Sequence, residues 1–105
     1  MMEIDIQNKI RKELSKYGVV LRLNTGVFRT ADGRTISSGL PAGTSDLLYV
    51  GENKVAFLEV KTPSGRPSPE QINFINKMRK LGHTAAIVRS VDDALKLIGV
   101  HKNEN

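Results

Sequence analysis

Residues 55–89 read VAFLEVKTPSGRPSPEQINFINKMRKLGHTAAIVR, and this stretch decides the fold because it predicts a strand, a helix and a second strand in succession. The apolar runs at 55–61 and 83–89 predict the two strands. Between them, Ser68-Pro69-Glu70-Gln71 is typical of a helix start: Ser is the N-cap, Pro takes the first helical position and Gln completes a capping box. Gly82 predicts the helix end after about Leu81. Such a unit predicts two parallel strands joined by a right-handed crossover.

The segments before this unit predict a further helix and further strands. Apolar residues at helical spacing predict a first helix from about Glu3 to Tyr17, and VVLRLN at 19–24 predicts a strand. Residues 26–45 contain an Asp-Gly turn signal and form either two short strands or a long loop. A long loop in a compact domain is usually functional.

A strand at 46–50 is expected to pair antiparallel with 55–61 through a four-residue connection at 51–54. A last short helix is predicted to begin after Ser90 and to end at Gly99. The order of elements predicts an α/β fold in which a mixed sheet of about four strands is flanked by helices.

The composition indicates which partners and which metal ligands are possible. The 105 residues include sixteen Lys and Arg against eleven Asp and Glu, a net charge of +5 that favours a polyanionic partner such as nucleic acid. Cys is absent and there are two His, so any metal is expected on oxygen ligands. We expect a single domain over 1–105 with a short polar tail at 100–105. No apolar run approaches a membrane span and no signal peptide is visible, which predicts a cytoplasmic protein without membrane association.

Three charged residues stand out at the ends of the predicted hairpin strands. Glu59 and Lys61 share one face of their strand because successive side chains alternate. With a connection at 51–54, Asp46 lies directly across from Glu59. Two carboxylates facing each other destabilise a sheet unless a cation bridges them, and Mg²⁺ prefers such oxygen ligands. The alternative is a solvated end of an edge strand carrying a weak ion pair.

The ordered set of residues resembles a known nuclease family. Asp46, followed after twelve residues by Glu59-Val60-Lys61, is similar to the PD-(D/E)xK nuclease signature. The wider pattern resembles its VRR-NUC branch, the virus-type replication-repair nucleases. Further matching segments are Glu3 and Gln7, Arg22 to Gly26, Gly39 to Asp46, Gly65, and Ser68 to Gln71 before Phe74. The resemblance implies a restriction-endonuclease-like αβββαβ core.

The resemblance also implies roles for single residues. Asp46 and Glu59 would bind Mg²⁺ or Mn²⁺ with the backbone carbonyl of Val60, and Lys61 would assist the attacking water. Glu3 would complete the metal site from the first helix, although a first-turn Glu also complements a helix dipole. Gln71 would position water, metal or Lys61, unless it serves the capping box alone. The sequence departs from the family at Ser45, which stands where the family usually has Pro.

The first functional hypothesis is therefore a metal-dependent DNA endonuclease. Minimal members of the branch act as homodimers on branched DNA, which implies a resolvase of four-way (Holliday) junctions. Enzymes of the same chemistry acting on flaps or ends, and a DNA-binding or assembly module without catalysis, are the alternatives. The candidate DNA-contacting residues, which could equally be solvated surface residues, are Arg22, Asn24, Arg29, Arg34, Lys54 and Arg66.

Overall fold

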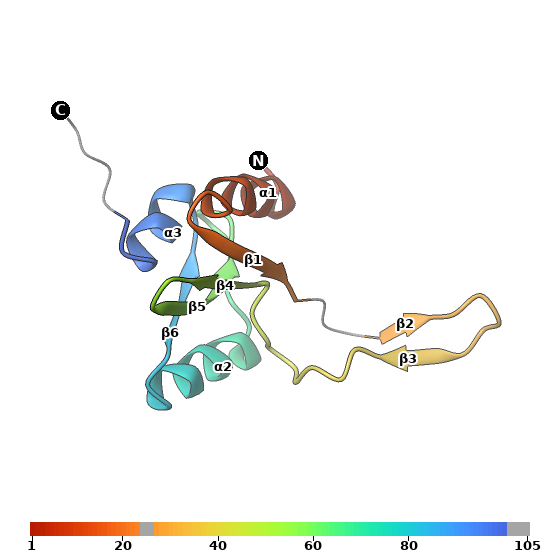
Figure 1. Ribbon diagram of the computed structural model, residues 1–105. Coiled ribbons are helices and arrows are strands. Elements are labelled where there is room, and N and C mark those ends of the chain that lie inside the picture. The colour runs from red at the N-terminus through yellow and green to blue at the C-terminus, as the bar shows by residue number, and fades with distance from the viewer. Residues whose placement is uncertain (24–26, 101–105) are drawn as a thin grey trace.

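The computed structural model of the protein describes residues 1–23 and 27–100 and confirms the α/β fold (Figure 1). Its elements follow the predicted order. Two short strands lie between the strands predicted at 19–24 and 46–50. In chain order they are α1 (Glu3–Leu14), β1 (Gly18–Arg22), β2 (Val27–Arg29), β3 (Thr35–Ser37), β4 (Leu47–Gly51), β5 (Lys54–Val60), α2 (Pro69–Lys80), β6 (Thr84–Val88) and α3 (Val91–Leu97).

The main sheet has four strands in the order β1-β4-β5-β6. β4 runs antiparallel to β1 and β5, whereas β6 runs parallel to β5, as the crossover through α2 predicts. In Figure 1, α1 and α3 lie on one side of the sheet and α2 lies on the other. The prediction of a mixed sheet flanked by helices is confirmed.

One face of β5 forms the centre of the hydrophobic core. Ala56, Leu58 and Val60 are fully buried and pack in one cluster with Ile10 and Leu14 of α1. The alternation along the strand therefore places Phe57 and Glu59 on the opposite face, toward α2. There the ring of Phe57 meets that of Phe74 edge-on, with ring centroids 5.6 Å apart.

The hairpin of β4 and β5 has the predicted register. Leu47 pairs with Leu58 and Gly51 pairs with Lys54, so Asp46, one residue before β4, comes opposite Glu59. The connection is shorter than expected, because the strands extend to Gly51 and Lys54. Asn53 takes a left-handed φ of 59° in this tight turn.

The structure differs from the sequence predictions at one other place. The first helix ends at Leu14 rather than Tyr17, because the amides of Lys16 and Tyr17 bond to the carbonyls of Glu13 and Leu14 in a tighter turn. Of the two alternatives predicted for residues 26–45, the described part of the segment confirms the two short strands on either side of the Asp-Gly turn. Within it, β2 and β3 pair with each other in a separate two-stranded sheet, which extends away from the body in Figure 1. We call residues 27–37 the arm.

Candidate active site

Glu59 is buried in a central strand. β5 lies between β4 and β6, and Glu59 is 1% exposed, so the alternative of a solvated edge-strand ion pair is wrong. Burial raises the pKa of Glu59 to about 9, and the adjacent Asp46 carboxylate adds to the rise, while Lys61 opposes it. A carboxyl group in such a place binds a proton strongly unless a cation offsets its charge.

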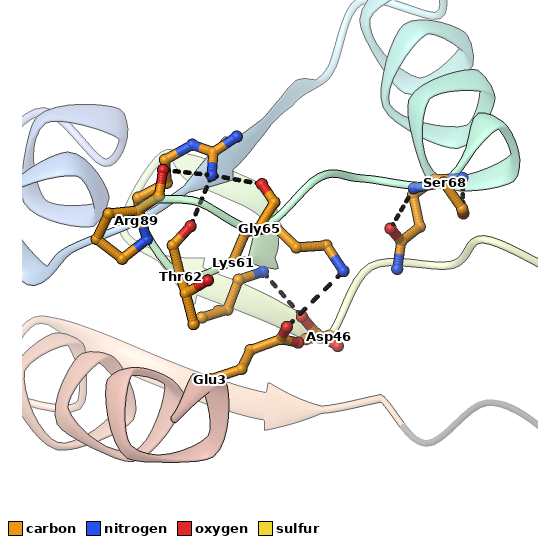
Figure 2. Close-up of polar contacts among 10 residues, drawn as sticks. Glu3, Asp46, Lys61, Thr62, Gly65, Ser68 and Arg89 are labelled. Atoms are coloured by element: carbon orange, nitrogen blue, oxygen red, sulfur yellow. Dashed lines mark hydrogen bonds and ion pairs between the residues drawn. The ribbon is translucent and has the colours of Figure 1, made fainter. Parts of the chain in front are cut away.

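Asp46 is held by the backbone on both of its neighbouring strands. The amide of Val60 donates to Asp46 Oδ2 at 2.8 Å (Figure 2). The amide of Leu23 donates to the Asp46 carbonyl at 2.8 Å. Ser45, which precedes it, is fully buried, and its hydroxyl donates to the Leu47 carbonyl at 3.3 Å. The carboxylate of Asp46 is therefore fixed at the end of β5 despite the absence of Pro at position 45.

Lys61 follows directly after β5 and turns toward α1. Its Nζ lies 3.8 Å from Glu3 Oε2 at the start of that helix, and the two side chains are 13% and 43% exposed, respectively (Figure 2). The ammonium group is also close enough to Glu59 to oppose the rise in the pKa of that carboxyl. Of the five residues that the resemblance assigns to catalysis, the structure brings four to the end of β5: Glu3, Asp46, Glu59 and Lys61.

Gln71 occupies the capping box of α2. Its Oε1 accepts from the Ser68 amide at 2.8 Å, and its own amide donates to Ser68 Oγ at 3.2 Å. The start of α2 packs closely on the segment that leads to Asp46. The contact is so close that a Cβ added to Gly43 would overlap the Glu70 carbonyl. The start of α2 therefore contacts the residues that precede Asp46. The side-chain oxygen of Gln71 is used in the capping box.

Arg89 is a residue of the site that the sequence reasoning missed. It follows β6, and its Nη1 donates to the carbonyls of Thr62 at 2.6 Å, Gly65 at 2.7 Å and Pro63 at 3.3 Å (Figure 2). These bonds satisfy the turn that follows Lys61. A signal was present in the sequence, since Arg89 is the last residue of the strand predicted at 83–89, which is expected to lie parallel to 55–61.

Two buried side-chain oxygens are available to bind a cation or a water molecule. Within the described residues, Glu59 Oε2 and Gln7 Oε1 have no hydrogen-bond partner. Gln7 is 6% exposed and lies one helical turn after Glu3, on the same side of α1. A buried carboxylate oxygen without a donor is costly alone and is a good ligand for a hard cation. The donor set therefore fits a divalent metal with additional water.

The protein residues do not form a complete metal cage by themselves. Within residues 1–23 and 27–100, no group of three or more Asp, Glu, His or Cys side chains is arranged to hold a metal ion. Magnesium usually keeps several waters and uses one or two carboxylates. The close pair of Asp46 and Glu59 meets that requirement.

A family model described as VRR-NUC domain matches residues 2–92. The chain belongs to the VRR-NUC domain family. This VRR-NUC domain is similar to a solved structure titled "VRR_NUC domain", with 25% identity, a TM-score of 0.67, and coverage of 95% of this chain and 97% of that chain. A second, "VRR_NUC domain protein", has 17% identity, a TM-score of 0.62 and 97% coverage of both chains, and it supports the fold alone.

No curated protein matches this VRR-NUC domain. The family is a nuclease family. Among the described residues, no helix has the length and apolar character needed to cross a membrane.

The residues predicted to contact DNA are distributed unevenly in this VRR-NUC domain. Arg22 is exposed at the end of β1 near Asp46, and Arg66 is exposed in the segment after Gly65. Arg29 and Arg34 lie on the arm, where Arg34 Nε pairs with Asp32 at 3.0 Å. Lys54 begins β5, at the end opposite Glu59, and donates to the Leu97 carbonyl at 3.4 Å. Asn24 lies outside the described residues.

Proposed function

We propose that this VRR-NUC domain is a metal-dependent DNA endonuclease that hydrolyses phosphodiester bonds. The observation that carries the proposal is the carboxylate pair of Asp46 and the buried Glu59, with Glu59 Oε2 unpaired among the described residues and Lys61 alongside. A protein that only binds DNA gains nothing from two carboxylates beside a phosphate.

Mg²⁺ or Mn²⁺ would be held by Asp46, Glu59 and the carbonyl of Val60, with Glu3 contributing from α1. When bound, such an ion polarises a phosphoryl oxygen and lowers the pKa of bound water. The Val60 amide keeps Asp46 oriented toward this position, because it donates to Oδ2. The fixed backbone of β5 thus places both acidic groups before any substrate arrives.

Lys61 orients the attacking water and offsets the negative charge that develops on the phosphate. Glu3, whose carboxylate is 3.8 Å from the ammonium group, restrains the position of the Lys61 side chain. Gln71 donates from its side-chain Nε2 to the water while its Oε1 remains in the capping box, where it accepts from the Ser68 amide. These roles use charge and orientation, which are the main sources of catalysis in phosphoryl transfer.

DNA approaches the end of β5 along exposed cations. In the sequence, Arg22 comes before Asp46 and Arg66 comes after Glu59. The arm adds two further cations, Arg29 and Arg34. Phosphate contacts of this kind give affinity that falls with salt and carries little sequence information. Lys54 is distant from the pair, so it would contact only DNA that reaches the other end of the sheet.

The preferred substrate is branched DNA, and a four-way junction cut by a homodimer is the specific form of the proposal. A chain of 105 residues is small compared with a junction, and two identical sites would deliver paired cuts. Flap or end cleavage uses the same residues and differs only in how the DNA is placed.

The test is cleavage of an end-labelled four-way junction, a flap and a matched linear duplex in Mg²⁺, Mn²⁺ or EDTA. We expect paired cuts in the junction that disappear with EDTA. Lys61→Ala should lower the rate by about 100-fold or more, with binding and fold retained. Lys80→Ala, at the end of α2, removes the same charge away from the site and should cut normally. Binding without cleavage under every metal would refute the endonuclease and leave a DNA-binding module.

A further inference from the structure

The arm carries an exposed apolar pair at a distance from the hydrophobic core. Phe28 and Ile36 face each other across β2 and β3 and are 49% and 54% exposed. The arm extends away from the body in Figure 1, and the molecule measures 57 × 30 × 30 Å. An isolated two-stranded hairpin is marginally stable in water. The apolar pair is therefore suited to a partner outside the fold rather than to the packing of its own body.

The tip of the arm is fixed by its own hydrogen bonds. The amide of Thr30 donates to the Arg34 carbonyl at 2.8 Å, and the Arg34 amide donates to Thr30 Oγ1 at 3.1 Å. The hydroxyl of Thr30 donates to the Asp32 carboxylate, and Arg34 Nε donates to the same carboxylate at 3.0 Å. A tip that is ordered in advance loses little conformational freedom when it binds a partner.

The surroundings of the apolar pair are cationic. Arg29 directly follows Phe28 and is exposed. Alternation along β3 places the exposed Arg34 on the face of Ile36, two residues away. Residues 22–45 contain three Arg and a single acid, which is the one held in the tip. The arm therefore suits a partner that offers negative charge and flat apolar surfaces together.

We propose that the arm binds unpaired bases of DNA. A base stacks on Phe28 beside Ile36, and the neighbouring phosphates lie at Arg29 and Arg34. Unpaired DNA offers the required combination, because each base presents a flat π-face close to a phosphate. Proteins that bind single strands combine aromatic side chains and cations in this way. The inference rests on the proposed DNA substrate and names the residues that would recognise unpaired bases in it.

Fully paired DNA fits the arm less well. In a duplex each base is covered by its stacked neighbours, so Phe28 reaches a base only after a base step has been unstacked, which costs free energy. At a fork or a gap the bases are already unpaired, and this cost is smallest there. The Arg residues contact phosphates, which both kinds of DNA present. Selectivity for unpaired DNA therefore comes from the apolar pair, and the cations add affinity for either kind.

The length of chain between the arm and the carboxylate pair limits where the unpaired bases lie. Asp46 comes ten positions after Ile36. Ten residues span at most about 33 Å when fully extended. Successive base pairs of a duplex are about 3.4 Å apart, so this length corresponds to about ten base pairs. The bases that the arm contacts thus lie within about ten base pairs of the bond that the proposed nuclease would cut.

The first test is fluorescence anisotropy in EDTA, with a splayed fork that carries unpaired thymines and a fully paired duplex. We expect the wild type to bind the fork more tightly. Phe28→Leu and Ile36→Ser should each raise the Kd for the fork at least about 5-fold and change the Kd for the duplex less than about 2-fold. Phe28→Tyr keeps an aromatic ring and should bind like the wild type. Leu81→Ser is the matched control, because Leu81 is 63% exposed at the end of α2.

A second test locates the stacked base directly. The unpaired thymines are replaced by 5-iodouracil, which on irradiation crosslinks to an aromatic ring stacked on it, and mass spectrometry identifies the crosslinked residue. We expect the crosslink at Phe28 and expect Phe28→Leu to lose it. Circular dichroism of each variant checks that the fold is retained.

The proposal would be overturned by equal affinity of the wild type for fork and duplex, by unchanged fork affinity in Phe28→Leu, or by a crosslink elsewhere. A wild-type dimer that Ile36→Ser dissociates without DNA would also overturn it, because the apolar pair would then belong to a second copy. Both tests are made without a metal, so they do not depend on cleavage. Fork binding through Phe28 by a protein that never cuts would refute only the nuclease. Cutting by a protein whose fork binding ignores Phe28 would refute only the role of the arm.

Discussion

Replacing Glu59 by Gln should stabilise the metal-free protein increasingly as the pH rises. Burial, followed by the proximity of Asp46, raises the pKa of Glu59 from 4.5 to about 9 in the folded protein. Between these values the unfolded chain loses its proton while the folded protein keeps it. The stability from this group is therefore complete below pH 4.5 and is lost as the pH rises through about 9. Gln has nearly the same shape and no proton to lose.

The magnitude follows from the width of the pH interval. From pH 5 to pH 8, each unit contributes about 1.36 kcal/mol for a group whose folded and unfolded pKa values lie outside the interval. The difference in unfolding free energy between Glu59→Gln and the wild type should thus grow by about 4 kcal/mol. A domain of this size has a total stability of about 5 to 15 kcal/mol, so the change is large enough to measure.

The assay is urea denaturation followed by far-ultraviolet circular dichroism at pH 5, 6, 7 and 8 in EDTA. Glu52→Gln is the control, because Glu52 is exposed in the turn between β4 and β5, and its curve should run parallel to the wild type. Added Mn²⁺ at pH 8 should stabilise the wild type and leave Glu59→Gln almost unchanged. Parallel pH curves for Glu59→Gln and the wild type would refute a protonated, buried Glu59.

Two further substitutions test how the site is supported. Arg89→Met removes three hydrogen bonds to the 62–65 turn and should lower the unfolding free energy by about 2 kcal/mol, with a larger fall in kcat than rise in KM; unchanged urea midpoint and kcat would contradict this role. Gly43→Ala places a Cβ against the Glu70 carbonyl at a φ of 84°, and should cost at least about 2 kcal/mol by thermal unfolding. Gly33→Ala is its control for a positive φ in open space, and equal losses would argue against the contact with α2.

The sequence predicted the part of the site that depends on local pairing. A hairpin with a short connection permits few registers. Counting residues outward from the turn was therefore enough to place Asp46 opposite Glu59. The helix start at Ser68 was likewise readable, because its capping residues are neighbours in the chain. These features need no knowledge of distant contacts.

Features that depend on tertiary packing could not be predicted in the same way. Arg89 reaches the turn after Lys61 only because β6 lies beside β5, and no local pattern specifies which carbonyls it bonds. The burial of Gln7 depends on the packing of α1. Lys54 counted as a possible DNA contact from its charge, yet its strand places it at the far end from Glu59.

The arm is joined to the sheet at two positions that the sheet itself holds together. Arg22 at the end of β1 pairs with Leu47 at the start of β4, and the Leu23 amide bonds to the Asp46 carbonyl just beyond. The two ends of the intervening segment are therefore neighbours whatever its length, and doubling a flexible loop costs only about 0.6 kcal/mol. Insertions and deletions between these ends should thus be tolerated by the main sheet. In related chains, this segment can therefore vary in length and surface chemistry while the pairing beside Asp46 and Glu59 stays unchanged.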